Sequence, residues 1–177
     1  MLEIKAPGMP KMLVSLYDQY KLIEPYRPWE GEPDRAEWED ESTGLQGRIV
    51  RNEITYTLCG YVGVTSTTNP DLIGVHYDHL NLADDYRPHG GFTYSGGGGG
   101  VHGGNVYWFG FDTAHADDFL PGIFIKMRMV GGVDGRKLFH GIPTENYRTW
   151  EFVDAEIRKV MDGLALRRYI IEEEKGV

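Results

Sequence analysis

The segment 89–118 limits most strongly what this chain can fold into. It reads HGGFTYSGGGGGVHGGNVYWFGFDTAHADD, with a His-Gly-Gly triplet on each side of a run of five glycines. Glycine loses more conformational freedom on folding than any other residue, so a glycine-rich segment weakens a domain unless the backbone needs unusual angles or close approach. Histidine and aspartate, which are also concentrated here, are side chains that transfer protons or bind metals near neutral pH. We therefore expect the functional site in this segment.

Length and composition are those of an ordinary globular protein. The 177 residues fit a single domain, 1–177, that is large enough to bury a hydrophobic core. No apolar run reaches the ~20 residues that a membrane-spanning helix needs, and the N-terminal sequence has no signal-peptide pattern. The single cysteine, Cys59, excludes an intrachain disulfide and fits a reducing cytosol.

The formal net charge of -9 restricts the partners. Binding to extended nucleic acid needs a face rich in lysine and arginine, whereas here the basic residues are scattered among more numerous acids. Extended nucleic acid and anionic membranes are therefore not expected as partners. A small anionic or nucleotide-like ligand held by one or two local arginines remains compatible with this charge, and so does a homo-oligomer.

The N-terminal part of the chain predicts a helix and then an irregular segment. Apolar residues recur at helical spacing between Met12 and Tyr20, after a proline, which predicts the first helix. The acidic segment 25–41 is predicted to be a solvated loop or briefly helical. Trp29 and Trp38 nevertheless require burial, so we expect this segment to pack against the domain.

Strands are predicted in the middle of the chain, where β-branched and aromatic residues are frequent. Two of them form a hairpin with a tight connection at Asn52-Glu53, and the glycine-rich segment 95–105 is predicted to be a mobile loop that joins two others. The predicted strands are Arg48–Asn52, Ile54–Val64, Phe92–Tyr94, Val106–Phe111 and Ile123–Val130.

A continuous apolar stripe, three and four residues apart, predicts a C-terminal helix from about Thr144, its N-cap, to Leu164. The tail 167–177 is predicted to be frayed. Strands between an N-terminal and a C-terminal helix favour an α+β domain with an antiparallel or mixed sheet, on which the stripe packs.

Four motifs occur in order along the chain: CGYVGV (59–64), HGGFTY (89–94), WFGFDTAH (108–115) and YR (147–148). This series resembles a family of small phage and prophage proteins, whose pattern is C-G-Y-x-G-V, H-G-G-x-T-Y, W-F-G-F-D-x-A-H and a Y-R before the last helix. The resemblance covers roughly residues 43 to 165. It implies a phage protein that acts in the host cytoplasm and has a shared site, but no particular reaction.

The resemblance also selects between the histidines. His89-Gly-Gly-Phe-Thr-Tyr continues directly into a predicted strand, as the pattern does, whereas His102-Gly-Gly lies beyond the five glycines. We therefore assign the family position to His89. The short spacing of His76 and His79 is typical of metal ligands, but these histidines stand where the pattern has acidic residues, which disfavours a metal site there.

The candidate catalytic residues are His115, Asp112, His89 and Cys59. Asp112 precedes His115 by three residues and is expected to orient its imidazole as a general base. Alternatively, His89, Asp112 and His115 hold a metal ion, with zinc in an open three-ligand site. The alternative without a functional role is that Asp112 only caps the following turn. For Cys59, a buried and unreactive thiol is favoured unless a cation or metal lies nearby.

The candidate substrate-binding residues are Arg51, Asn52, Tyr94, Trp108 and Arg148. An arginine beside a helix N-terminus suits a phosphate or carboxylate. Surface arginines that form ion pairs with the acidic segment explain the pattern equally well. The five glycines lack the lysine and Ser/Thr of a P-loop, so a nucleotide-binding fold is not predicted.

Three functions remain. The first is a small phage hydrolase or transferase that uses the His/Asp site, with or without zinc, on a nucleotide-like or other small polar substrate. The second is a binding protein that sequesters a host signalling nucleotide. The third is a module that contacts a host or virion protein. Clustered His, Asp and Cys favour the first, and the absence of an established catalytic motif favours the second.

Overall fold

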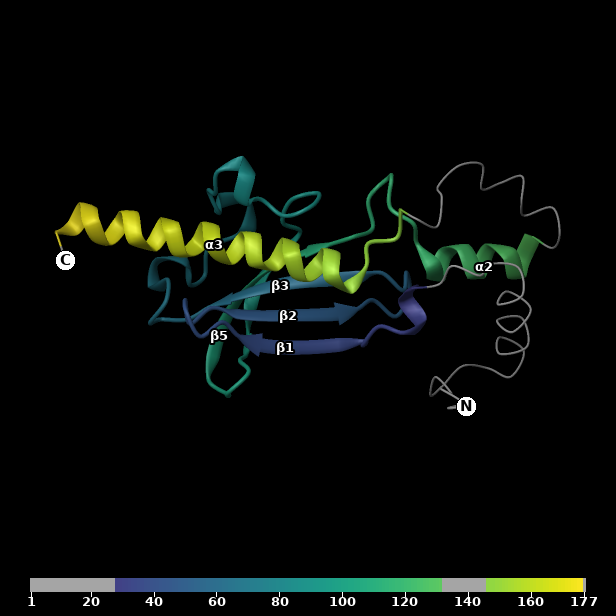
Figure 1. Cartoon of the computed structure of the whole chain (residues 1–177), viewed down its shortest axis with the longest axis horizontal. Helices are drawn as coiled ribbons and strands as arrows, with labels where there is room; N and C mark the ends of the chain where they lie inside the picture. Colours follow the sequence, from purple (N-terminus) through teal and green to yellow (C-terminus); the bar gives the residue numbers. More distant parts are fainter. Residues whose placement is uncertain (1–27, 132–145, 177) are drawn as a thin grey trace.

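The computed structural model describes residues 28–131 and 146–176. These residues form one antiparallel sheet of five strands, with a long C-terminal helix, α3 (Trp150–Lys175), along one of its faces (Figure 1). The strand order is β1–β2–β3–β5–β4. The strands are β1 (Arg35–Glu39), β2 (Gln46–Arg51), β3 (Leu58–Val64), β4 (Tyr94–Gly99) and β5 (Asn105–Asp112).

The remaining elements lie in the connections. They are the helix α2 (Pro121–Gly131) and four short 3-10 turns, η1 (Pro28–Glu30), η2 (Pro70–Leu72), η3 (Tyr77–His79) and η4 (Asp84–Tyr86). The predicted α+β class, with an antiparallel sheet packed by a C-terminal helix, is confirmed. The predicted N-terminal helix lies outside the described residues. Within the described ranges, no helix is long and apolar enough to cross a membrane.

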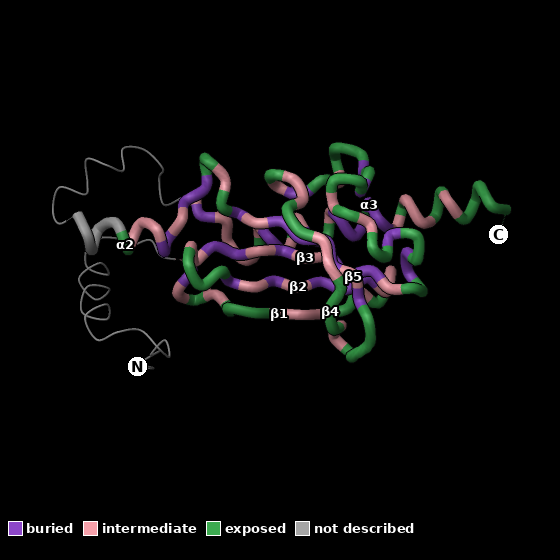
Figure 2. Tube along the Cα trace, turned by 180° about the vertical axis from the view of Figure 1, so that it is seen from behind, coloured by how far each residue is buried: buried purple, intermediate pink, exposed green. Residues whose placement is uncertain are grey.

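The core lies between α3 and the central strands, where Figure 2 shows buried segments concentrated between exposed edges. Gly60 of β3 pairs with Phe111 of β5, and a Cβ on Gly60 would lie 2.4 Å from the Phe111 ring and 3.0 Å from Val153 of α3. The missing side chain therefore lets the helix approach the sheet. The predicted stripe is confirmed, because Val153, Ile157, Val160 and Leu164 are fully buried.

The glycine run is a strand rather than a mobile loop, so the prediction for 95–99 was wrong. Its backbone pairs with β5 throughout, from Tyr94 opposite Gly110 to Gly99 opposite Asn105. Strand pairing uses only backbone N–H and C=O groups, so a run of glycines can form a strand when a neighbouring strand supplies the hydrogen-bond partners. The hairpin then turns through Gly103 and Gly104, whose φ angles of 79° and 84° favour glycine.

Three other predictions, for residues before α3, need correction. Residues Ile123–Val130, predicted as a strand, belong to the helix α2. This helix begins at Pro121, and proline is favoured at the first position of a helix. The acidic segment contains the strand β1, in which Trp38 lies over Gly47 of β2. The hairpin connection is not a tight turn but spans residues 52–57.

Helix α3 also differs from its predicted bounds. Its N-cap is Thr149, whose hydroxyl accepts a hydrogen bond from the Phe152 N–H, and not Thr144, which lies outside the described residues. The helix continues to Lys175, so the prediction of a frayed tail was wrong for 167–175. Arg167 pairs with Asp71, and Arg168 donates to the Thr43 carbonyl, which ties the extension to the domain.

The packing of α3 on the sheet predicts how much two truncations to alanine lower the free energy of unfolding. Ile157 is fully buried between α3 and the sheet, whereas Leu166 on the same helix is 43% exposed. Ile157→Ala should lower the free energy of unfolding by about 2–5 kcal/mol, through lost burial and the cavity left behind. Leu166→Ala should cost less than about 1 kcal/mol. Urea unfolding measures both, and equal losses would contradict the packing of α3 on the sheet.

Candidate functional site

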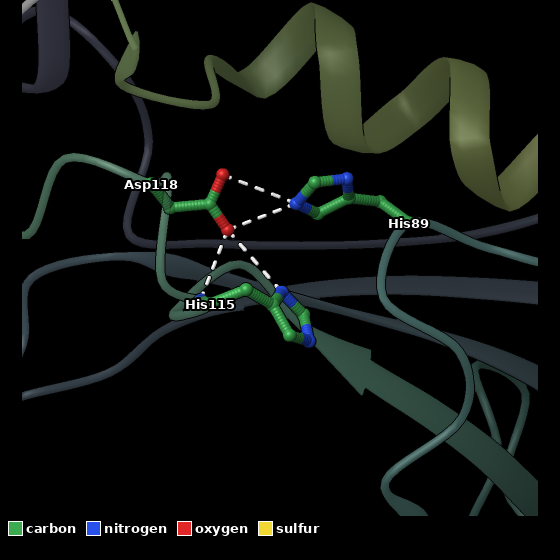
Figure 3. Close-up of side chains that lie close together, drawn as sticks. All are labelled: His89, His115 and Asp118. Carbon is green, nitrogen blue, oxygen red and sulfur yellow. Dashed lines mark hydrogen bonds and ion pairs between the residues drawn. The ribbon is translucent and has the colours of Figure 1, made fainter.

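Two histidines and one aspartate converge beyond the end of β5, below the N-terminal part of α3 (Figure 3). The Nε2 atom of His89 lies 2.9 Å from Oδ2 and 3.1 Å from Oδ1 of Asp118. The Nδ1 atom of His115 lies 3.2 Å from the same Oδ2. The Asp118 side chain is completely buried, whereas the histidine side chains keep 24% and 32% of their surface exposed. The cluster is thus anchored inside and accessible outside.

Local backbone bonds explain why Asp118 and His115 meet. A turn follows β5, in which the Asp118 N–H donates to the His115 carbonyl at 3.0 Å. The carboxylate in turn accepts the His115 N–H at 3.1 Å. An aspartate three residues after a histidine therefore closes the turn and places its oxygen beside the imidazole.

The other members come from distant parts of the chain. The backbone N–H of His89 donates to the Glu156 carboxylate of α3 at 2.6 Å, and its ring packs edge-on against Phe152 at 5.4 Å. Arg148, just before α3, donates from Nε to Oδ1 of Asp118 at 2.7 Å. Three segments that are far apart in the sequence are therefore joined at one carboxylate.

Gly90 explains the His-Gly-Gly motif. Its φ angle is 68°, and a Cβ there would lie 2.0 Å from the His115 ring, a distance no side chain can occupy. Gly91 also has a positive φ of 85°, but its side-chain direction opens into free space. Gly90 thus lets two segments of the cluster approach closely, and the cluster contains His89, whereas His102 is exposed and lies near Glu39.

Asp118 remains anionic in this setting. Burial acts to raise its pKa, but hydrogen bonds from His89, from Arg148 and from the His115 backbone N–H outweigh burial and lower the pKa below its ordinary value. A charged carboxylate can orient two imidazoles or ligate a cation. The ligand atoms of His89, His115 and Asp118 all lie within 4.8 Å of one another, so the group could hold a metal ion.

Asp112 does not take the predicted position beside His115. Its Oδ2 accepts the Thr93 hydroxyl at 3.0 Å, and its Oδ1 accepts the Ala114 N–H at 3.0 Å. Asp112 thus caps the turn after β5, which was the structural alternative. Asp118, three residues after His115 instead of three before it, makes the contacts expected of Asp112. The printed sequence contained this signal, because the same spacing occurs on both sides of the histidine.

Cys59 also lies apart from the histidine cluster. It faces Asp112 across the β3–β5 pair and lines a cavity of about 350 Å³ on the sheet. Burial and the Asp112 carboxylate raise the pKa of the Cys59 thiol to about 11, and a hydrogen bond with Tyr61 offsets this only in part. A thiol with this pKa is protonated at neutral pH, so the geometry gives no support to a nucleophilic role.

Two predicted substrate-binding residues are used inside the fold. Arg51 is buried, and its guanidinium bonds the carboxylates of Glu32 and Asp34 and the hydroxyl of Tyr147. Trp108 is 2% exposed and lies beneath the guanidinium of Arg48, 3.9 Å from the ring centre. Neither side chain is accessible to a ligand.

The other three substrate-binding candidates are divided between the cavity and the histidine cluster. Asn52 and Tyr94 line the same cavity as Cys59. Arg148 lies in the histidine cluster, with 29% of its side chain exposed and its guanidinium 5.0 Å above the Phe152 ring. Among the described residues, Asp118 is the only hydrogen-bond or ion-pair partner of its guanidinium. That contact uses only Nε of the guanidinium.

Comparisons with known proteins give no further assignment: no family model matches this chain, and no curated protein or solved structure is significantly similar to it. The resemblance to phage proteins therefore remains a prediction from the four motifs.

The two glycines after His89 provide a matched test of the site geometry. Both Gly90→Ala and Gly91→Ala should cost about 1–2 kcal/mol of folding free energy, because alanine disfavours a positive φ. Gly90→Ala should cost about 1–3 kcal/mol more, because the methyl group must displace the His115 ring. Urea unfolding and the NMR signals of the imidazoles test this. Equal costs, with His115 signals unchanged in both variants, would contradict the close contact.

The raised pKa of Cys59 predicts a slow thiol. Alkylation by iodoacetamide at pH 7.5 should be at least ~100-fold slower than for an ordinary cysteine, because only the thiolate reacts. Since the thiolate fraction rises tenfold per pH unit below the pKa, the rate should keep rising toward pH 11. Mass spectrometry follows the reaction, with urea-unfolded protein as the control. A rate that is already maximal at pH 8 would disprove the raised pKa.

Proposed function

We propose that this protein is a small hydrolase or transferase whose centre is formed by His89, His115 and Asp118. The observation that carries the proposal is the convergence of two partly exposed imidazoles on one fully buried carboxylate. A purely structural aspartate at a turn needs one or two donors, whereas Asp118 receives four groups from three segments. Such a concentration of titratable groups is typical of catalytic sites.

Zinc is the metal that this donor set fits best. Two imidazole nitrogens and a carboxylate oxygen match a catalytic zinc site with an open fourth position. Ligands of tetrahedral zinc lie roughly 3.4 Å from one another, and Oδ2 of Asp118 lies 2.9 and 3.2 Å from the two imidazole nitrogens. Those nitrogens and Oδ2 need only small shifts, since all ligand atoms are within 4.8 Å.

The contacts at Oδ2 indicate where a cation would bind. The backbone N–H of His115 and the nitrogens of both imidazoles all lie within 3.2 Å of this one oxygen. His89 Nε2 also lies 3.1 Å from Oδ1, so the two oxygens together, with about four lone-pair sites, accept all four donors. One cation shared by both imidazoles would occupy a single lone-pair site of Oδ2 and leave the other site of that oxygen to the N–H.

The surrounding residues would orient the ligands and the substrate. Arg148 holds Oδ1 of Asp118, which leaves Oδ2 directed at the histidines, and its outer nitrogens would bind an anionic group such as a phosphate. Glu156 fixes the backbone of His89. When bound, zinc supplies a Lewis acid that polarises a substrate oxygen and lowers the pKa of water. These roles fit a small, anionic or nucleotide-like substrate.

Metal analysis tests the centre directly. The zinc-loaded protein should contain about one zinc ion per chain by elemental mass spectrometry. His89→Ala, His115→Ala and Asp118→Asn should each weaken zinc binding at least tenfold, because each removes one of three ligands. The matched control is His79→Ala, since His79 is an exposed histidine in η3, outside the cluster. Loss of zinc in the control, or retention in all three variants, would overturn the centre.

Activity should follow the same residues. Incubation of the zinc-loaded protein with nucleotides and phosphate esters should reveal turnover, and His115→Ala should lower kcat at least ~100-fold, as loss of a centre residue does. Its urea midpoint should change little, because His115 is partly exposed. If a nucleotide raises the melting temperature without turnover, the sequestering function replaces the enzyme.

A further inference from the structure

The cavity on the sheet is distinct from the histidine cluster. Residues of β3 and β5 alternate between two faces, and Gly60 and Phe111 face α3. Cys59 and Asp112, their neighbours in sequence, therefore lie on the opposite face. The cavity occupies this face at the ends of β3 and β5, with a volume of about 350 Å³. That is the lower end of the range of small-molecule sites, roughly 300–1,000 Å³.

Two tyrosines form an aromatic corner in the cavity. Tyr61 and Tyr94 both lie opposite Gly110 of β5, one on each side. Their rings are 5.7 Å apart and nearly perpendicular, at 83°. A Cβ on Gly110 would lie 2.5 Å from the Tyr61 ring, so only glycine leaves room for the ring at this position. Tyr94 is 45% exposed, which leaves part of its surface available for contact.

The polar groups of the cavity are hydroxyls, the Asn52 amide, the Cys59 thiol and one carboxylate. Each oxygen of Asp112 accepts one bond, from Thr93 or from the Ala114 N–H, and keeps capacity for another. The Thr55 and Thr57 hydroxyls bond each other at 2.8 Å. No lysine, arginine or histidine is among the described residues that line the cavity. An anion would therefore meet only negative or neutral groups, whereas a ligand with several O–H donors would find acceptors.

We propose that this cavity binds a neutral, hydroxylated sugar ring. The apolar C–H face of the ring would pack on the Tyr61–Tyr94 corner, and its hydroxyls would donate to Asp112 and exchange bonds with the threonines. The proposal rests on the proposed function in one respect: the sugar is the neutral part of the substrate of the histidine cluster. Ala114 lines the cavity and His115 follows it directly, which makes the two sites neighbours.

Binding of neutral probes tests the cavity without any turnover. Isothermal titration of the full chain with uridine and with methyl glucoside should show saturable binding of at least one of them. For inorganic phosphate, the binding heat should be the same in the parent protein and in Asp112→Asn. Asp112→Asn and Tyr94→Ala should each weaken binding of the sugar probe at least tenfold. Asp84→Asn, at an almost fully exposed carboxylate of η4, is the matched control and should leave it unchanged.

The outcomes separate this proposal from the catalytic one. His115→Ala should bind the sugar probe as the parent protein does, because His115 does not line the cavity. Sugar binding without zinc or turnover would support the cavity and overturn only the catalytic centre. The cavity proposal would be overturned if neither sugar probe bound. It would also be overturned if Asp112→Asn and Tyr94→Ala both bound the probe as tightly as the parent protein. Preferential binding of the amine agmatine would overturn it too, because it would indicate a cation site around Asp112.

Discussion

The buried carboxylate of Asp118 is the interaction on which the arrangement of this end of the molecule depends. A charge in the interior is tolerated only when partners replace the water that it loses. Asp118 obtains them from its own turn, from the loop that contains His89, and from Arg148 before α3. The same bonds that stabilise the charge also position the two histidines.

Glycine has three different physical roles in this fold. Gly60 and Gly110 have no side chain, so aromatic rings pack directly on the strand backbone at both positions. Gly60 thereby sets the distance between the sheet and α3, and Gly110 sets the shape of the cavity. Gly90 combines a positive φ with contact to the His115 ring and so joins two site segments. The run in β4 uses backbone pairing alone. A high glycine content therefore reflects close packing here more than mobility.

The candidate site and the cavity lie at the same end of the sheet but on different faces. The chain turns after β5, so Asp112 lines the cavity, whereas His115, three residues later, lies in the histidine cluster. The histidine cluster has cationic and anionic partners around it, whereas the cavity contains only neutral groups and one carboxylate. A substrate with one charged and one hydroxylated part would match this division.

The sequence by itself determined the elements that depend on local patterns. The apolar stripe of α3 and the strands around Cys59 and Trp108 follow from period and composition, which act within a few residues. The candidate site region around His89 and His115 was selected by its glycine, histidine and aspartate content and by the resemblance. Tertiary structure decided the rest. Whether a glycine run pairs as a strand depends on a neighbouring strand, and the apolar run of α2 fits a helix or a strand equally well by composition. The choice of Asp118 over Asp112 was also tertiary, because both stand three residues from His115 and only the positions of His89 and Arg148 distinguish them.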